Sequence, residues 1–264
     1  MSNASESVET CCPVVELRQY TVKPGALETL VSVFEEHFIE GQERTGMRIL
    51  GQFRDLSNPN RFVWLRGFST MEARRQALSD FYSGPLWKEH GPAANETMID
   101  SDDVLLLRPV DAQAGFAFDP RLRPPMSALS AASASAESGG VVVATIYPVS
   151  PGVSPALVES AANEIQAAFT EARATLLARL VTEHAPNTFP SLPVRKDVDA
   201  IVWLASYASE EEYRRTTARM MSLPLWKERV EPKLETIRGG ASPESLLLQP
   251  TRRSLLRHRS ASSR

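Results

Sequence analysis

The sequence has few of the features that mark secreted, membrane-spanning or nucleic-acid-binding proteins. Of its 264 residues only two are cysteines, the neighbours Cys11 and Cys12, so no disulfide framework can join distant segments. No run approaches the roughly 18 apolar residues of a membrane-spanning helix, and residues 1–10 contain acids but no apolar stretch typical of a signal peptide. The formal net charge of −3 gives no electrostatic reason to expect a nucleic-acid partner. We therefore expect a cytoplasmic protein without a membrane span.

Several short motifs with known chemistry are also absent. The patterns HExxH, CxxC, GxGxxG, GxSxG and the P-loop do not occur, which excludes zinc proteases, Rossmann enzymes, serine hydrolases and nucleotide hydrolases of those types. The sequence predicts no cofactor and no metal site. Any chemistry has to come from side chains that are dispersed along the chain.

What the sequence does contain is an internal repeat. Residues 62–89 (FVWLRGFSTMEARRQALSDFYSGPLWKE) align with residues 201–228 (IVWLASYASEEEYRRTTARMMSLPLWKE) at an offset of 139. Upstream, YTVKPG from Tyr20 matches YPVSPG from Tyr147 at an offset of 127. The offset changes because the second copy has a longer loop within residues 183–199. Matched tryptophans followed by an identical PLWKE string indicate two copies of one unit.

Each copy shows the same order of periodicities. In the first copy, alternation and helical spacing predict strands at 14–22, 47–54, 61–68 and 103–108 and helices at 26–44 and 70–79. This β-α-β-β-α-β order is ferredoxin-like, so we predict an α+β fold in which two tandem units pair their sheets into a pseudo-dimeric α/β barrel. The expected segments are a disordered N-terminus (1–12), a first domain (13–110), an Ala/Ser/Pro-rich linker (111–139), a second domain (140–250) and a basic disordered tail (251–264).

The strand over residues 61–68 predicts how the two sheets meet. Val63 and Leu65 point to one face, whereas Phe62, Trp64 and Arg66 point to the other. The aliphatic pair suits contact with the helices of its own unit. The ring-bearing face is too apolar to lie in water, so we expect it to face the other copy inside the barrel.

The motifs of the first copy resemble those of the NIPSNAP family. The resemblance rests on ELRQYTVKPG (16–25), the strand that contains Trp64, and PLWKEHGP (85–92), and it extends over 14–110. The second copy matches mainly through VWL (202–204) and PLWKE (224–228). The resemblance implies ferredoxin-like units paired around a barrel, and a molecular activity that is undefined, because the family has no settled reaction. The wider dimeric α/β-barrel superfamily includes cofactor-free monooxygenases, haem-handling enzymes and isomerases, so the fold does not determine the function.

A candidate ligand pocket follows from strand alternation. If the face of Arg18 and Tyr20 looks into the barrel, these residues meet Trp64 and Arg66 and form a cationic, aromatic cavity suited to a small organic acid or phenol. The proposed pocket is completed by Trp87, Tyr147 and Trp203. The alternative is that Glu16 and Arg18 pair with each other or with neighbours and simply satisfy a polar interior.

The two copies keep their aromatic positions and differ at titratable ones. Tyr20 and Trp64 recur as Tyr147 and Trp203. Four residues do not recur, since Arg18, Arg66, His37 and His90 become Thr145, Ala205, Glu164 and Arg229. The pattern fits two ancestral sites of which one survives in the first copy, and it also fits drift in a second copy that has no site.

The candidate catalytic residues are His90 and His37, because imidazole can exchange protons near neutral pH. The alternative for His90 is a helix-end residue that contacts terminal carbonyls. We expect a NIPSNAP-domain protein that binds a small aromatic or anionic metabolite in the barrel, or acts on it as a cofactor-free monooxygenase or isomerase. The rival is a non-enzymatic interaction protein with a fully packed barrel. Association into a homo-oligomer is left open.

Overall fold

The computed structural model describes residues 10–127 and 140–259. The first half contains β2 (Val14–Val22), α1 (Leu27–Val33), the π-helical η1 (Phe34–Phe38), α2 (Ile39–Glu43), β3 (Arg48–Asp55), β4 (Arg61–Phe68), α3 (Met71–Ser83), α4 (Pro85–Thr97) and β5 (Met98–Pro109). The second half contains β7 (Val141–Val149), α6 (Pro155–Glu171), β8 (Thr175–Thr182), β9 (Asp199–Tyr207), α7 (Glu210–Ser222), the π-helical η4 (Trp226–Val230), α8 (Glu231–Arg238) and β10 (Glu244–Pro250). No helix among the described residues is both long and apolar enough to cross a membrane.

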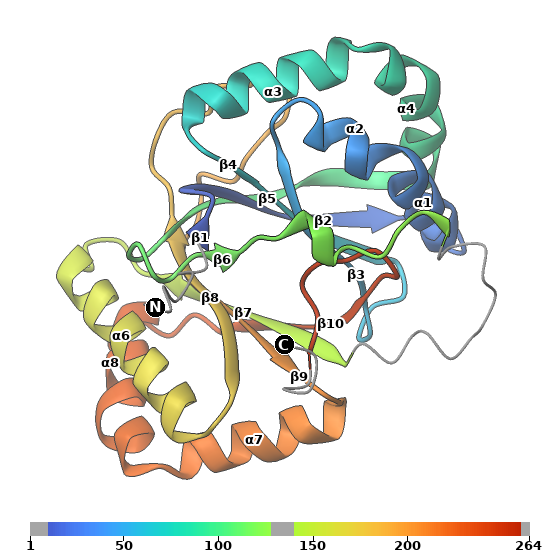
Figure 1. Ribbon diagram of the computed structural model, residues 1–264. Helices are drawn as coiled ribbons and strands as arrows, with labels where there is room; N and C mark the ends of the chain where they lie inside the picture. The colour runs from blue at the N-terminus through green and yellow to red at the C-terminus, as the bar shows by residue number, and fades with distance from the viewer. Residues whose placement is uncertain (1–9, 128–139, 260–264) are drawn as a thin grey trace, which may run out of the picture.

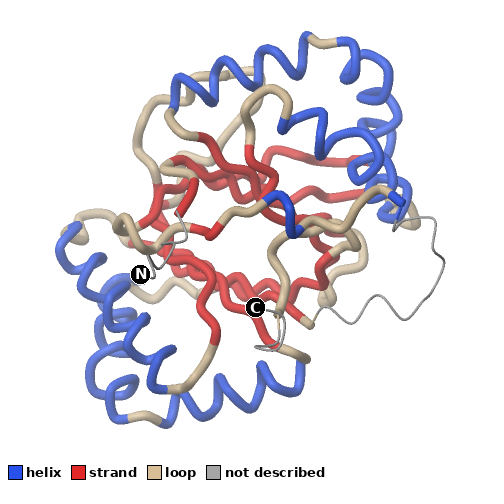
Figure 2. Tube along the Cα trace, in the orientation of Figure 1, coloured by secondary structure: helices blue, strands red, loops and turns tan. Residues whose placement is uncertain are grey.

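Eight strands form one closed antiparallel barrel. Their order is β10-β3-β4-β2-β5-β8-β9-β7, and pairing of β7 with β10 closes the ring. The two halves are joined by β5 with β8 and by β3 with β10. Figure 1 shows the helices of the first half covering one side of this barrel and those of the second half covering the opposite side, and Figure 2 shows the strands gathered between them. The predicted α/β barrel is confirmed at this level.

Aliphatic side chains from both halves fill the barrel interior. The buried cluster there includes Val15, Leu17, Val63, Leu65, Leu105 and Leu107 of the first half and Val142, Ala144, Leu180, Val202, Leu204 and Leu248 of the second. An eight-stranded barrel is just wide enough for its inward side chains to fill it. The interior is therefore a packed core.

The predicted orientation of the strand faces is wrong. Phe62 and Trp64 pack with the helices of the first half, whereas Val63 and Leu65 point into the barrel. The period of two identifies which residues share a face but not which face lies inward. Branched aliphatic side chains fit the narrow interior, and the bulky rings fill the wider layer between sheet and helices.

Both predicted disordered ends are wrong where the structure describes them. Residues 10–11 form β1 (Thr10–Cys11), which pairs with β6 (Phe116–Ala117) of the predicted linker, and Cys11 and Cys12 form a disulfide with Cys12 buried. In the tail, Arg253 is 2% exposed and pairs with Glu40, so residues 251–259 are packed against the first half. The composition of these two segments is typical of disorder. It could not reveal their partners, which are β6 for residues 10–11 and Glu40 for Arg253. Residues 1–9, 128–139 and 260–264 lie outside the described residues.

Candidate functional site

The predicted pocket residues lie in two separate places. Arg18, Tyr20, Trp64, Arg66 and Trp87 lie under the helices of the first half. Tyr147 and Trp203 lie under those of the second, in a different buried cluster on the opposite side of the barrel. They do not line one shared cavity, and the predicted site inside the barrel is wrong because aliphatic side chains occupy that space.

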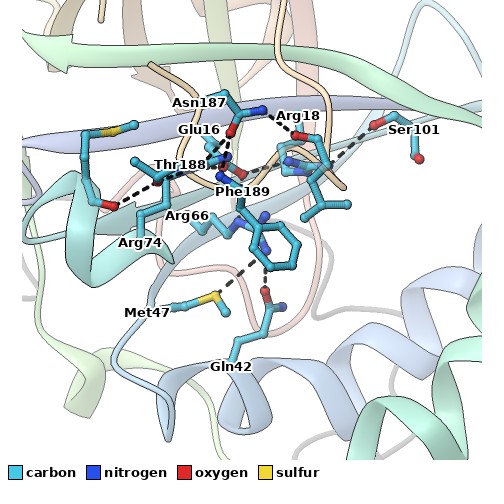
Figure 3. Close-up of polar contacts among 12 residues, drawn as sticks. Glu16, Arg18, Gln42, Met47, Arg66, Arg74, Ser101, Asn187, Thr188 and Phe189 are labelled. Carbon is cyan, nitrogen blue, oxygen red and sulfur yellow. Dashed lines mark hydrogen bonds and ion pairs between the residues drawn. The ribbon is translucent and has the colours of Figure 1, made fainter. Parts of the chain in front are cut away.

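The polar centre of the first half is a buried group of four residues, here called the arginine cluster: Glu16, Arg18, Arg66 and Arg74. Glu16 Oε2 lies 2.7 Å from Arg18 Nη1 and 2.8 Å from Arg66 Nε, and Glu16 Oε1 lies 2.6 Å from Arg74 Nε. All four side chains are at most 1% exposed (Figure 3). Glu16 thus does pair with Arg18, as the alternative interpretation held, but within a larger group.

Electrostatics keep Glu16 ionised despite its burial. Burial favours the neutral acid, but the guanidiniums of Arg66, Arg18 and Arg74 outweigh it and hold the pKa of Glu16 well below its usual range. Arg18 Nε also donates to Tyr20 Oη at 3.0 Å. The guanidinium carbons of Arg18 and Arg66 lie 5.6 Å and 5.0 Å from the ring centre of Trp64, close enough for cation–π attraction.

Arg74 was missed in the sequence, although a signal for it was present. With Ala77, Leu78 and Phe81 it forms the spacing i, i+3, i+4, i+7 on α3, and all four residues are buried. Its place in that stripe marks it as an inward-facing charge. The sequence could not show that its partner is Glu16, 58 residues away.

A loop from the second half covers the arginine cluster. It comprises residues 183–198, between β8 and β9. Arg74 Nη1 donates to Asn187 Oδ1 at 2.9 Å and to Thr188 Oγ1 at 3.3 Å, and Thr188 Oγ1 donates to the carbonyl of Met71 at 3.0 Å. Phe189 stacks on Tyr82 with ring centres 6.0 Å apart. Figure 3 shows Asn187, Thr188 and Phe189 of this loop close to Glu16 and Arg74.

Little free space remains beside this cluster. An inner cavity of about 30 Å³ lies among the rings of Tyr20, Phe34, Phe38, Trp64, Phe81, Tyr82 and Trp87, next to Gln42. An outer groove of about 470 Å³ lies between the covering loop and α3 and α4. Tyr82 and Trp87 line both spaces, so their rings stand between the groove and the inner cavity.

The second half has a larger cavity at the equivalent place. In the first half Arg18 pairs across the sheet with Trp64 and Glu16 with Arg66, and in the second half Thr145 pairs with Trp203 and Val143 with Ala205. Smaller residues thus replace the charged cluster, leaving a cavity of about 130 Å³. It is lined by the aromatic residues Tyr147, Phe169, Trp203, Tyr207, Tyr213 and Trp226, and by the hydroxyl-bearing residues Thr145, Thr217 and Ser245.

The two histidines meet, but away from both cavities. The rings of His37 on η1 and His90 on α4 stack with centres 3.6 Å apart and planes inclined by 2°. Their side chains are 33% and 24% exposed, and neither lines the inner cavity of the first half or the cavity of the second. Among the described residues, no group of three or more histidine, cysteine or acidic side chains could hold a metal ion.

Fold and sites together define a helix-covered α/β-barrel protein in which two halves of one chain share a single barrel. Residues 15–113 match the NIPSNAP family model, so the first half is a NIPSNAP domain and the resemblance read from its motifs is confirmed. None of the curated proteins compared with the chain matches it.

Solved structures resemble the whole chain at low identity. A candidate monooxygenase from Lactobacillus acidophilus has a TM-score of 0.56 and 12% identity, over 94% of this chain and 99% of its own. A candidate monooxygenase from Fusobacterium nucleatum has a TM-score of 0.56 and 11% identity, over 95% and 99%. An anthrone oxidase-like protein has a TM-score of 0.55 and 14% identity, over 93% and 92%. At these identities the likeness concerns the fold alone.

Proposed function

We propose that the protein binds a small aromatic metabolite in the cavity of the second half. The observation that carries this proposal is a cavity of about 130 Å³ that is lined largely by aromatic residues. An apolar cavity of about 150 Å³ holds benzene, so one ring fits here. The hydroxyls of Thr145, Thr217 and Ser245 would orient a polar substituent, which is how ligand sites gain specificity. A phenol is the simplest compound with this chemistry.

The lining favours binding of a neutral compound. None of the described residues that line this cavity is charged, and burial raises the pKa of Tyr207, so its phenol stays protonated as a hydrogen-bond donor. One of the structures that resemble this fold is described as anthrone oxidase-like, and anthrone is an aromatic compound, which agrees with an aromatic ligand here. The proposal does not extend to His37 or His90 as the base, because they lie outside the cavity.

The same proposal includes an origin in two ferredoxin-like copies. Both halves run β-α-β-β-α-β, and equivalent residues hold equivalent places in the sheet. Under this view the two halves diverged at equivalent places between sheet and helices. The first half has the arginine cluster there, and the second half has an open cavity. The packed barrel core agrees with the rival interaction protein, so ligand binding in the second half is the distinguishing property.

Filling the cavity tests the proposal. Ala205 is 1% exposed and lines the space, so Ala205→Leu places three more carbon atoms inside it. Phenol at about 100 times its Kd is expected to stabilise the wild type by about 2.7 kcal/mol in thermal unfolding. Ala205→Leu is expected to abolish that stabilisation.

The matched control is Ala208→Leu, the same change at an exposed position just after β9. It should keep the response to phenol. The proposal is wrong if no single-ring aromatic compound stabilises the wild type, or if Ala205→Leu responds as the wild type does.

A further inference from the structure

The arginine cluster contains more positive charge than the protein neutralises. Among the described residues, Glu16 is the only carboxylate that forms an ion pair with Arg18, Arg66 or Arg74. One carboxylate against three guanidiniums leaves an excess of two positive charges, in side chains that are at most 1% exposed. Buried charge is costly unless it is paired, so the cluster favours a further anion.

Two guanidinium nitrogens are free to bind such an anion. Arg66 Nη2 and Arg74 Nη2 are buried and have no hydrogen-bond partner within the described parts of the chain. The two arginines bind different oxygens of the same Glu16 carboxylate, which holds them side by side. Among the described residues, Arg66 Nη1 donates to two neutral acceptors, Gln42 Oε1 at 3.0 Å and Met47 Sδ at 3.8 Å. Paired guanidiniums with open donors are a typical carboxylate-binding arrangement.

The covering loop supplies neutral oxygens at the same place. Asn187 Oδ1 and Thr188 Oγ1 both accept a hydrogen bond from Arg74 Nη1. A carboxylate would bind the same guanidinium more strongly than these neutral oxygens do. The loop itself lies at the wall of the outer groove through Phe189, Ser191 and Leu192. Displacement of the loop would therefore expose Arg74 from the side of that groove.

We propose that the arginine cluster is a binding site for an organic carboxylate with an aromatic body, reached through the groove beside loop 183–198. The carboxylate binds Arg66 and Arg74, and displaces the oxygens of Asn187 and Thr188 from Arg74. The body occupies the outer groove of about 470 Å³ and packs against the rings of Tyr82 and Trp87, which line it. The rings around the cluster favour an organic anion over inorganic phosphate. The site is separate from the neutral cavity of the second half and does not depend on it.

Benzoate is the probe, with sodium chloride at equal ionic strength as the reference. Saturating benzoate, about 100 times its Kd, is expected to raise the Tm of the full chain by about 5–10 °C, and Arg74→Met is expected to remove the rise. The matched control is Arg179→Met, since Arg179 is a buried arginine of the second half that pairs with Asp111. That variant should keep the benzoate response. Phenol measured in parallel reports on the other cavity, so failure at one site is distinguishable from failure at the other.

A second variant applies even if Arg74→Met does not fold. In Asn187→Ala/Thr188→Ala the loop no longer competes for Arg74, so calorimetry should show benzoate binding about 2- to 10-fold tighter than in the wild type, which corresponds to about one net hydrogen bond. Absence of benzoate stabilisation in the wild type, or an equal response in Arg74→Met, overturns the site. If Asn187→Ala/Thr188→Ala binds benzoate as tightly as the wild type or more weakly, the loop does not compete with the ligand for Arg74. A response to phosphate as large as that to benzoate overturns the preference for an organic anion.

Discussion

Glu16→Gln is expected to lower the free energy of unfolding by about 3–5 kcal/mol, the usual consequence of removing one partner from a buried ion pair. The change keeps the shape of the side chain but leaves Arg18, Arg66 and Arg74 buried without a negative charge. Urea denaturation monitored by tryptophan fluorescence measures the loss. Trp64 lies against two of these arginines and reports on the same region.

The effect of Glu16→Gln is also expected to depend on pH. The folded-state pKa of Glu16 is lowered from an ordinary value of 4.5, so its stabilising contribution is complete above that pH and is lost as the pH falls further. The wild type should therefore lose its advantage over Glu16→Gln below about pH 4.5, because the unfolded chain then takes up a proton at Glu16 that the folded chain does not, and this stabilises the unfolded state. Repeating the urea titrations from pH 7 to pH 3 measures this trend.

Glu164→Gln is the matched control. Glu164 is also buried, but its partners Arg229 and Lys233 are 63% and 29% exposed. Water can solvate these cations when the charge is removed, so we expect a loss of about 1 kcal/mol or less. Equal losses in the two variants, or a pH-independent gap for Glu16→Gln, would contradict the view that Glu16 holds a buried excess of positive charge.

Ending the chain after Pro250 is expected to destabilise the protein by about 3–6 kcal/mol, mainly through the loss of two buried leucines at roughly 1.5–3 kcal/mol each. Leu255 and Leu256 are 9% and 7% exposed, and Leu256 belongs to the barrel core cluster. The truncation also removes Arg253, whose backbone N–H donates to Glu35 Oε1 at 2.7 Å. Thermal and urea unfolding of the shortened chain measure the loss.

The control for the tail is Arg259→Ala, an exposed position in the same basic segment. It should change stability by no more than about 0.5 kcal/mol. If the shortened chain unfolds at the same urea concentration as the full chain, residues 251–259 do not contribute to the folded core.

Sequence patterns predicted the fold better than the site. The matched strings around Trp64 and Trp203 indicated two like units around one barrel, because short-range periodicity reflects secondary structure directly. Alternation in the strand of Trp64 could not tell the interior of the barrel from the helix layer, and this ambiguity reversed the predicted pocket. Closure of the sheet determines which face of this strand points inward, since the narrow interior of the barrel accepts Val63 and Leu65 and leaves no room for tryptophan.

The positions at which the aligned segments differ in sequence lie in different surroundings in the two halves. Arg18 and Arg66 are buried and pair with Glu16, whereas their counterparts Thr145 and Ala205 line a cavity. Asn187 and Thr188 could not be predicted, because they reach the first half from a loop whose length, but not its direction, is visible in the sequence. Long-range contacts of this kind leave no local periodic signal.

Loop 183–198 and residues 251–259 both leave the second half and pack on the first. Two identical chains around a twofold axis would carry each of these extensions twice, one for every subunit. A single continuous chain can carry each of them once, on one side only. Because the two halves are covalently linked, the first half can contain the arginine cluster while the second half provides the loop and the tail that cover the first. A symmetric homodimer of this fold cannot have this asymmetric arrangement.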